Sequence, residues 1–144
     1  MSSMTLTPLP PAIETELRRH CEAEYPHEAC GALIGTGDGE NEPWRVEEIR
    51  RAPNVHGDDH ARRYLIPPDF QLQVEKYARQ IGREVVGFYH SHPDHEADPS
   101  EYDRVHAWAG YLYLICSVRD RKSEALRTLA LAPTGFFVDV LASP

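Results

Sequence analysis

One apolar run near the end of the chain constrains its fold more than any other feature. Tyr111–Val118 has the length of a strand and shows no alternation of apolar and polar residues. A strand of this kind is buried on both faces and lies in the middle of a sheet. Because helices must then cover both faces, we expect a sandwich of one mixed sheet flanked by helices. The sequence therefore predicts an α/β or α+β fold.

Two segments carry apolar residues at helical spacing. The first, Ala12–Tyr25, follows the pair Pro10-Pro11, which the first turn of a helix tolerates. The second, Asp69–Gly82, also follows a proline pair and ends at a glycine. A third, short helix is expected to begin near Ser100. The apolar stripe of the second helix consists of Phe70, Val74, Tyr77, Ala78 and Ile81.

Five further segments have the composition of strands. Ala29–Gly35 and Trp44–Ile49 are separated by a turn-rich stretch and are expected to pair in antiparallel fashion. Glu84–His92 is rich in β-branched and aromatic residues. Ala125–Leu131 and Phe136–Leu141 are expected to close the sheet.

Length and charge bound the class of protein. The 144 residues fit one domain, expected at residues 11–144 behind a flexible N-terminal tail at residues 1–10. Fifteen Lys and Arg against 23 Asp and Glu give a net charge of −8 without a basic cluster, which argues against a nucleic-acid partner. The uncharged apolar stretch at residues 107–118 is too short to span a membrane. Three cysteines at no disulfide-like spacing and an N-terminus without a secretory pattern favour the cytoplasm.

The segment from residue 89 to residue 103 carries the residues with metal chemistry. Side chains alternate across a strand, so His90 and His92 project from one face and can hold one ion between them. Imidazole and carboxylate suit zinc, and a catalytic zinc keeps three protein ligands and one position for water. Asp103 is the candidate third ligand, because a helix capped by Ser100 would place it in the first turn, near the strand end. Such a ligand set leaves the ion positive, which acidifies water.

Hydrolysis also needs a base that is not a metal ligand. Glu28 is the candidate, since it lies at the start of the strand that begins at Ala29 and can pass a proton from water to a leaving amine. Ser100 can donate its hydroxyl to a developing oxyanion.

Each of these residues also has an ordinary structural interpretation. Ser100 and Asp103 have the spacing of a capping box, which satisfies the donors at the start of a helix. A His-x-His pair in a strand is more often structural than metal-binding, and a lone glutamate such as Glu28 is usually a solvated acid. The combination of two histidines with a serine and an aspartate at fixed offsets favours the metal site.

This combination resembles a known family. His90-Ser91-His92, seven residues, Ser100, two residues and Asp103, with a glutamate far upstream, is similar to the signature of the JAMM (MPN-plus) zinc metallopeptidases. The segment from residue 26 to residue 35 is similar to the glutamate strand of that family. The resemblance implies a JAMM/cytidine-deaminase-like architecture and one Zn²⁺ per chain. It further implies that the ligands are His90, His92 and Asp103, that the general acid/base is Glu28, and that the oxyanion donor is Ser100.

The resemblance also implies a substrate. The family cleaves peptide or isopeptide bonds after the C-terminal Gly-Gly of ubiquitin-like proteins. The strand at Tyr111 follows Asp103 closely, as in bacterial stand-alone members, of which the characterised kind releases cysteine from a ThiS/MoaD-type sulfur-carrier protein. We therefore expect a zinc metallopeptidase of the isopeptidase type. A non-catalytic module that docks ubiquitin-like tails is the alternative, and the oligomeric state stays open.

Several other residues have two interpretations. The loop at residues 53–63 is either solvated or borders the cleft, where Arg62 and Arg63 would hold the Gly-Gly tail. Cys30 is expected in the core rather than as a nucleophile. Exposed or outer positions are expected for His95, Glu96 and His106, and core positions for Trp108, Tyr111 and Tyr113.

Overall fold

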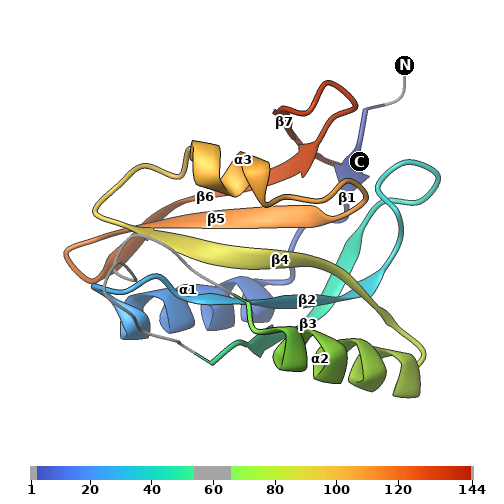
Figure 1. Cartoon of the computed structure of the whole chain (residues 1–144), viewed down its shortest axis with the longest axis horizontal. Helices are drawn as coiled ribbons and strands as arrows, with labels where there is room; N and C mark the ends of the chain where they lie inside the picture. Colours follow the sequence, from blue (N-terminus) through green and yellow to red (C-terminus); the bar gives the residue numbers. More distant parts are fainter. Residues whose placement is uncertain (1–2, 54–65, 144) are drawn as a thin grey trace.

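A mixed sheet of six strands, in the order β3-β2-β4-β5-β6-β7, forms the centre of the fold (Figure 1). The computed structural model describes residues 3–53 and 66–143 of the chain. The strands of this sheet are β2 (Cys30–Thr36), β3 (Arg45–Arg51), β4 (Glu84–Pro93), β5 (Leu112–Arg119), β6 (Lys122–Leu131) and β7 (Phe137–Asp139). The helices are α1 (Pro11–Glu24), α2 (Pro68–Gln80) and α3 (Glu101–Val105). One mixed sheet with flanking helices confirms the predicted fold class.

β5 occupies the central position that its apolar sequence predicts. It lies between β4 and β6, and every residue of the strand before Arg119 is buried. β5 runs parallel to β4, and α3 lies in the crossover that a parallel pair requires. The two strands approach closely where they begin to pair, because a Cβ atom on Gly87 would lie 1.8 Å from the carbonyl oxygen of Leu112. Glycine is therefore needed at this position of β4.

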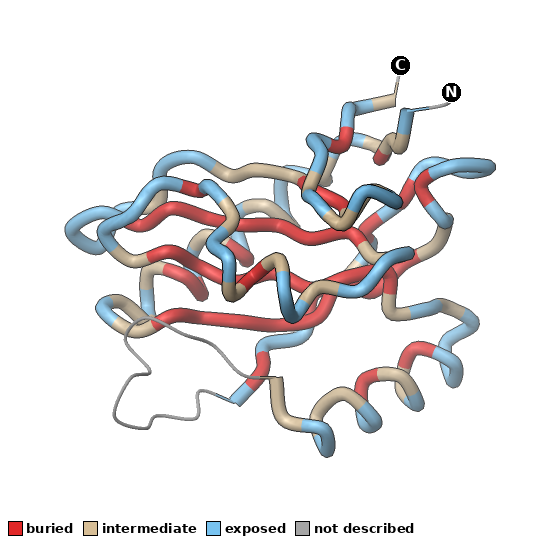
Figure 2. The backbone as a smooth tube through the Cα atoms, turned by 45° about the horizontal axis from the view of Figure 1, so that its top comes forward, coloured by how far each residue is buried: buried red, intermediate tan, exposed pale blue. Residues whose placement is uncertain are grey.

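Two hydrophobic clusters lie on opposite faces of the sheet. α1 packs on the cluster that contains Tyr89 of β4, and α2 packs on the cluster that contains Phe88. Because side chains alternate along a strand, His90 and His92 share the face of Phe88. Figure 2 shows the buried strands at the centre, with the partly exposed helices outside them. The metal-ligand candidates thus lie on the α2 side of the sheet.

The N-terminal residues differ from the predicted tail. Thr5–Leu6 forms β1, which pairs in parallel with β8 (Leu141–Ala142). Leu6 is 4% exposed and belongs to the cluster under α1. The predicted strand Phe136–Leu141 is consequently divided between β7 and β8, which belong to different sheets. Two residues are too few to show a strand pattern, and their partner lies at the opposite end of the chain.

The stripe predicted for the second helix is buried in its middle. Val74 and Ala78 are buried, whereas Ile81 is 43% exposed because α2 ends one residue earlier, at Gln80. In the ranges 3–53 and 66–143, no helix is long and apolar enough to cross a membrane.

Candidate metal centre

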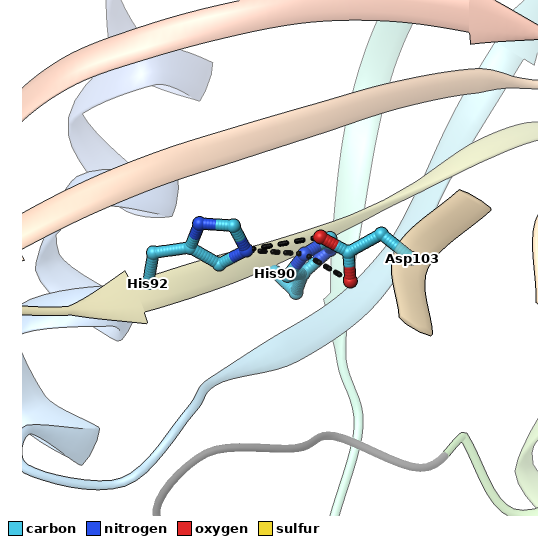
Figure 3. Close-up of side chains that lie close together, drawn as sticks. All are labelled: His90, His92 and Asp103. Carbon is cyan, nitrogen blue, oxygen red and sulfur yellow. Dashed lines mark hydrogen bonds and ion pairs between the residues drawn. The ribbon is translucent and has the colours of Figure 1, made fainter. Parts of the chain in front are cut away.

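One strand and one short helix bring the predicted ligands together. His90 and His92 follow each other on one face of β4, between β2 and β5, and both side chains are buried. Asp103 lies in the first turn of α3, which places its carboxylate over these two rings (Figure 3). Asp103 Oδ1 lies 3.1 Å from His90 Nε2, and Asp103 Oδ2 lies 3.0 Å from His92 Nε2. The three side chains predicted from the sequence therefore converge.

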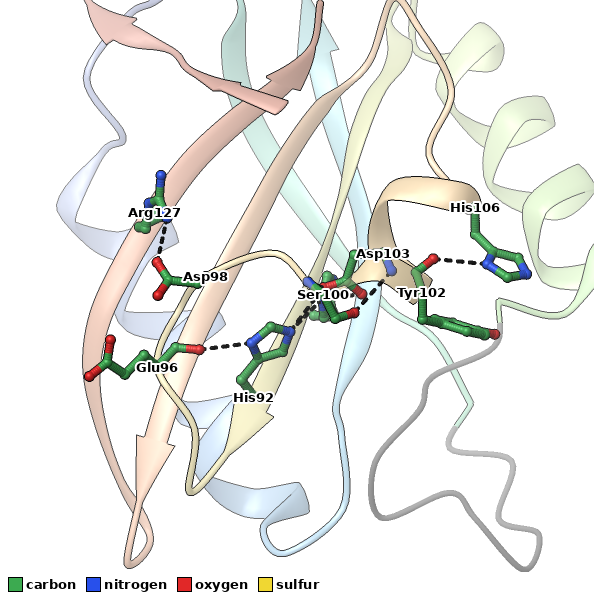
Figure 4. Close-up of polar contacts among 9 residues, drawn as sticks. His92, Glu96, Asp98, Ser100, Tyr102, Asp103, His106 and Arg127 are labelled. Atoms are coloured by element: carbon green, nitrogen blue, oxygen red, sulfur yellow. Dashed lines mark hydrogen bonds and ion pairs between the residues drawn. The ribbon is translucent and has the colours of Figure 1, made fainter. Parts of the chain in front are cut away.

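The start of α3 combines the two interpretations of Ser100 and Asp103. The Asp103 N–H donates to Ser100 Oγ at 3.0 Å, and the Ser100 N–H donates to Asp103 Oδ2 at 2.9 Å. This reciprocal pair is the capping box that the spacing indicates (Figure 4). The cap holds the Asp103 carboxylate in the position from which it contacts both histidines. Capping and metal binding are thus compatible roles of one side chain.

The donor atoms fit zinc. His90 Nε2 and His92 Nε2 lie 3.2 Å apart, and one donor atom from each of the three residues lies within 4.8 Å of the others. Nitrogen ligands about 2.0–2.1 Å from a tetrahedral zinc are separated by about 3.3 Å, close to this distance. His92 Nδ1 donates its proton to the carbonyl oxygen of Glu96 at 2.8 Å, which directs the lone pair of Nε2 toward His90 and Asp103. Two imidazole nitrogens and a carboxylate form the expected ligand set of a catalytic zinc.

The protonation of two of these groups also suits a metal. Burial lowers the pKa of His90, which keeps the ring neutral. Burial alone would raise the pKa of Asp103, but hydrogen bonds to His90 and His92 hold this pKa well below its ordinary value. A neutral imidazole and an ionised carboxylate are the forms that bind metal ions.

Glu28 lies beside this group, two residues before β2 begins at Cys30. The residue is 7% exposed, and its Oε2 has no hydrogen-bond partner among the described residues. Burial is the main cause that raises the pKa of Glu28 to about 8; the charge of His92 opposes it, and the negative charge of Asp103 adds to it. A buried carboxyl with a pKa near neutrality and a free oxygen has the properties of a general base.

Glu28 shares one cleft with His92, one of the metal-ligand candidates. The cleft, with a volume of about 720 Å³, is also lined by His92 and Ser100. Its remaining walls come mainly from the loop between β4 and α3: Pro93, Asp94, His95, Glu96 and Asp98. A substrate bond placed in this cleft reaches Glu28, Ser100 and one face of the metal-ligand group together.

Comparison with known proteins agrees with this arrangement. A family model described as prokaryotic homologues of the JAB domain matches residues 10–131. The chain belongs to this JAB family. The JAMM-type resemblance of the sequence is thereby confirmed.

Individual relatives of this JAB domain cover most of its length. A desampylase of Haloferax volcanii is 34% identical over 107 residues, which are 74% of this chain and 73% of the relative. The solution structure of a protein from Salinibacter ruber is 39% identical, with a TM-score of 0.69 over 94% of this chain and 90% of that one. The crystal structure of a JAB1/MPN domain protein from Archaeoglobus fulgidus, 17% identical, has a TM-score of 0.54 over 92% of this chain and 94% of that one. The last likeness concerns the fold alone.

The structure places the remaining predicted residues of the JAB domain as follows. His95, Glu96 and His106 are exposed, and the His106 ring stacks on Tyr102 with the centroids 4.0 Å apart (Figure 4). Cys30 is 4% exposed, and burial raises the pKa of its thiol to about 12, so this thiol stays protonated. Arg62 and Arg63, with most of the loop at 53–63, lie outside the described residues.

The predicted core position of Trp108 is wrong. Trp108 is 55% exposed, whereas Tyr113 is 5% exposed as predicted. Trp108 lies in the connection between α3 and β5, where its backbone N–H donates to the Tyr113 hydroxyl at 2.8 Å. It borders an apolar cavity of about 170 Å³ that is also lined by Phe88, Tyr102, His106 and Tyr113. Phe88 lies two residues before His90 in β4, and Tyr102 directly precedes Asp103 in α3. The cavity therefore lies next to the candidate centre.

Ser91 is the residue of this region that the sequence leaves without a role. It is fully buried, and its side chain points to the face opposite His90 and His92. The sequence feature that could have revealed it is a small polar residue at a position of β4 that faces the core.

Proposed function

We propose that this JAB domain is a zinc-dependent isopeptidase, which hydrolyses a peptide or isopeptide bond after the C-terminal Gly-Gly of a ubiquitin-like or sulfur-carrier protein in the cytoplasm. The observation that carries the proposal is the convergence of His90, His92 and Asp103 beside the buried, unpartnered oxygen of Glu28. A site that only bound a metal would not need the Glu28 carboxyl beside the ligand group, which already contains the carboxylate of Asp103. The desampylase relative supports a carrier protein as the substrate.

In this proposal His90, His92 and Asp103 hold the zinc ion. When bound, zinc supplies a Lewis acid that lowers the pKa of water and polarises a carbonyl group. Glu28 takes the proton from the attacking water and returns it to the leaving amine, a role that its pKa of about 8 permits near neutral pH. Ser100 Oγ accepts the Asp103 N–H at 3.0 Å, so its own O–H can donate to the oxyanion.

We further propose that the carrier tail extends from this cleft toward the apolar cavity at Trp108. Gly-Gly is narrow enough to pass between close walls, and aromatic side chains bind an apolar residue further up the tail. A leaving cysteine and a leaving lysine side chain both agree with this geometry, because each departs as an amine. The role of Arg62 and Arg63 in holding the tail stays a prediction.

The test uses a carrier protein in two forms, one extended by a cysteine after Gly-Gly and one joined through Gly-Gly to a peptide lysine. Each is incubated with the zinc-loaded protein and with Glu28→Gln, and the products are weighed by intact-mass spectrometry. We expect cleavage by the wild type and a loss of at least about 100-fold in rate in Glu28→Gln at equal zinc content, because only the proton carrier is removed.

The matched control is Glu47→Gln, which removes an exposed acid that forms an ion pair with Arg83 and does not line the cleft. Its activity should stay near that of the wild type. If neither substrate is cleaved although zinc is bound and the carrier binds, the non-catalytic docking module is the correct function. If Glu28→Gln retains its rate, the proposed proton transfer is wrong.

A further inference from the structure

A buried side chain of the metal-ligand strand bonds to the chain segment that carries Glu28. Ser91 is 0% exposed and lies between the two histidines of β4. Its Oγ accepts the backbone N–H of Ala29 at 2.8 Å, and its own N–H donates to the Ala29 carbonyl oxygen at 3.0 Å. Ala29 directly follows Glu28. Both backbone groups of the residue next to the candidate base are therefore held by Ser91.

The side-chain bond replaces a bond that the sheet does not provide. β2 begins at Cys30, which pairs with His90, so Ala29 lies just outside the regular ladder. Ala29 is 1% exposed, and its N–H would have no water to bond if the Ser91 hydroxyl were absent. An unsatisfied buried N–H costs about 1–3 kcal/mol, which favours a shift of the backbone at this point. Such a shift would move Glu28, which has no hydrogen bond of its own at Oε2 to hold it.

The position of Ser91 separates this role from metal binding. Its side chain lies on the α1 side of the sheet, whereas His90, His92 and Asp103 meet on the α2 side. Since Ser91 is fully buried, it cannot touch a substrate in the cleft. Its hydroxyl is connected to the cleft through Ala29 and the neighbouring Glu28.

We infer that Ser91 is a positioning residue, whose hydroxyl oxygen fixes the distance between the candidate base Glu28 and the metal ligands. The inference rests on the proposed function. It concerns the residue between the two histidines, which couples the ligand strand to the base-bearing segment across β2 and β4. The expected consequence of its loss is a slower chemical step at unchanged zinc content and unchanged substrate affinity.

The experiment compares Ser91→Ala and Ser91→Thr with the wild type, each loaded with zinc. The substrate is the Gly-Gly carrier form that the wild type cleaves, and kcat, KM, zinc content and melting temperature are all measured. For Ser91→Ala we expect kcat to fall about 10-fold or more with KM within about twofold, because small misplacements of catalytic groups are costly. Ser91→Thr keeps the acceptor oxygen and should retain most of kcat. Should Ser91→Ala not fold, Ser91→Cys gives the same comparison, because sulfur is a weak acceptor of similar size.

The matched control is Thr128→Val, which removes a hydroxyl that donates to the Val140 carbonyl at 2.9 Å on the far side of the sheet. It costs stability without touching the β2–β4 pair, so its kcat should stay near that of the wild type. Equal losses of kcat in Ser91→Ala and Thr128→Val, a loss of zinc, or an unchanged kcat in Ser91→Ala each overturn the positioning role. An inactive wild type with zinc bound overturns the proposed function instead, so the two failures are distinguishable.

Discussion

Acid should destabilise this protein through His20, a residue remote from the cleft. His20 lies in α1, is 2% exposed and shares a hydrogen bond of 2.6 Å with the hydroxyl of Tyr89. Its pKa is lowered from 6.5 to about 4, mainly by burial and also by the charge of Arg51, while Glu24, 3.8 Å away, partly opposes them. Because the folded state resists protonation of His20 while the unfolded state accepts it at its ordinary pKa, stability falls as the pH drops.

The magnitude follows from the two pKa values. A depressed histidine contributes its full stability above the unfolded pKa of 6.5 and loses it as the pH falls through the folded pKa of about 4. The difference of 2.5 units corresponds to about 3 kcal/mol in total, of which about 2 kcal/mol is lost between pH 7 and pH 5. That is a large share of the stability of a domain of this size.

The assay is urea unfolding of zinc-free protein between pH 7 and pH 4, followed through the fluorescence of Trp44, which is 1% exposed. His20→Gln removes the titrating group and keeps a side chain that can bond to Tyr89. Other titrating groups, including Glu28 and the two ligand histidines, are the same in both proteins and cancel in the difference. We expect the free energy of unfolding of the wild type, relative to that of His20→Gln, to decrease by about 2 kcal/mol between pH 7 and pH 5. A difference that stays within about 0.5 kcal/mol over this range would refute the reasoning.

Three further outcomes are expected. Removing zinc with a chelator should abolish hydrolysis and lower the melting temperature. Added zinc should restore both in the wild type but not in Asp103→Ala. An active zinc-free protein would contradict the metal site. Even without zinc, Asp103→Ala should be about 1 kcal/mol less stable in urea unfolding, because the capping box is lost. Trp108→Ala should raise KM for the carrier about 3- to 10-fold and change stability by less than about 0.5 kcal/mol, because Trp108 is 55% exposed; an unchanged KM would exclude its cavity as a tail site.

The candidate site was predictable because most of it is local. His90 and His92 share a face through strand alternation alone, and Ser100 fixes Asp103 through the first turn of a helix. These relations span residues 90–103 and need no knowledge of the rest of the chain. Glu28 was a candidate base from its place at the start of the predicted strand at Ala29, but its approach to the histidines depends on the long-range pairing of β2 with β4. The central position of β5 followed from its unbroken apolar sequence.

The features that escaped prediction depend on distant contacts. β1 exists only because residues 5–6 meet residues 141–142, and neither segment has a pattern of its own. Trp108 has the composition of a core residue, but the turn before β5 leaves it outside the sheet, where no partner in the described residues covers it fully. The role of Ser91 became visible only when its acceptor bond to Ala29 was placed in space.

The double use of the Asp103 carboxylate has a consequence for how such a protein changes over generations. Its Oδ2 both closes the start of α3 and faces His92, so replacement by asparagine can preserve the helix cap with an amide oxygen while removing the anionic ligand. A single substitution then separates the fold from the proposed hydrolysis: the sheet, the cleft and the aromatic cavity persist, and the candidate metal centre loses its anionic ligand. An ancestral hydrolase of this design is thus one mutation away from a folded descendant that only holds its partner. The reverse substitution, from asparagine to aspartate, restores the anionic ligand without any change in the fold.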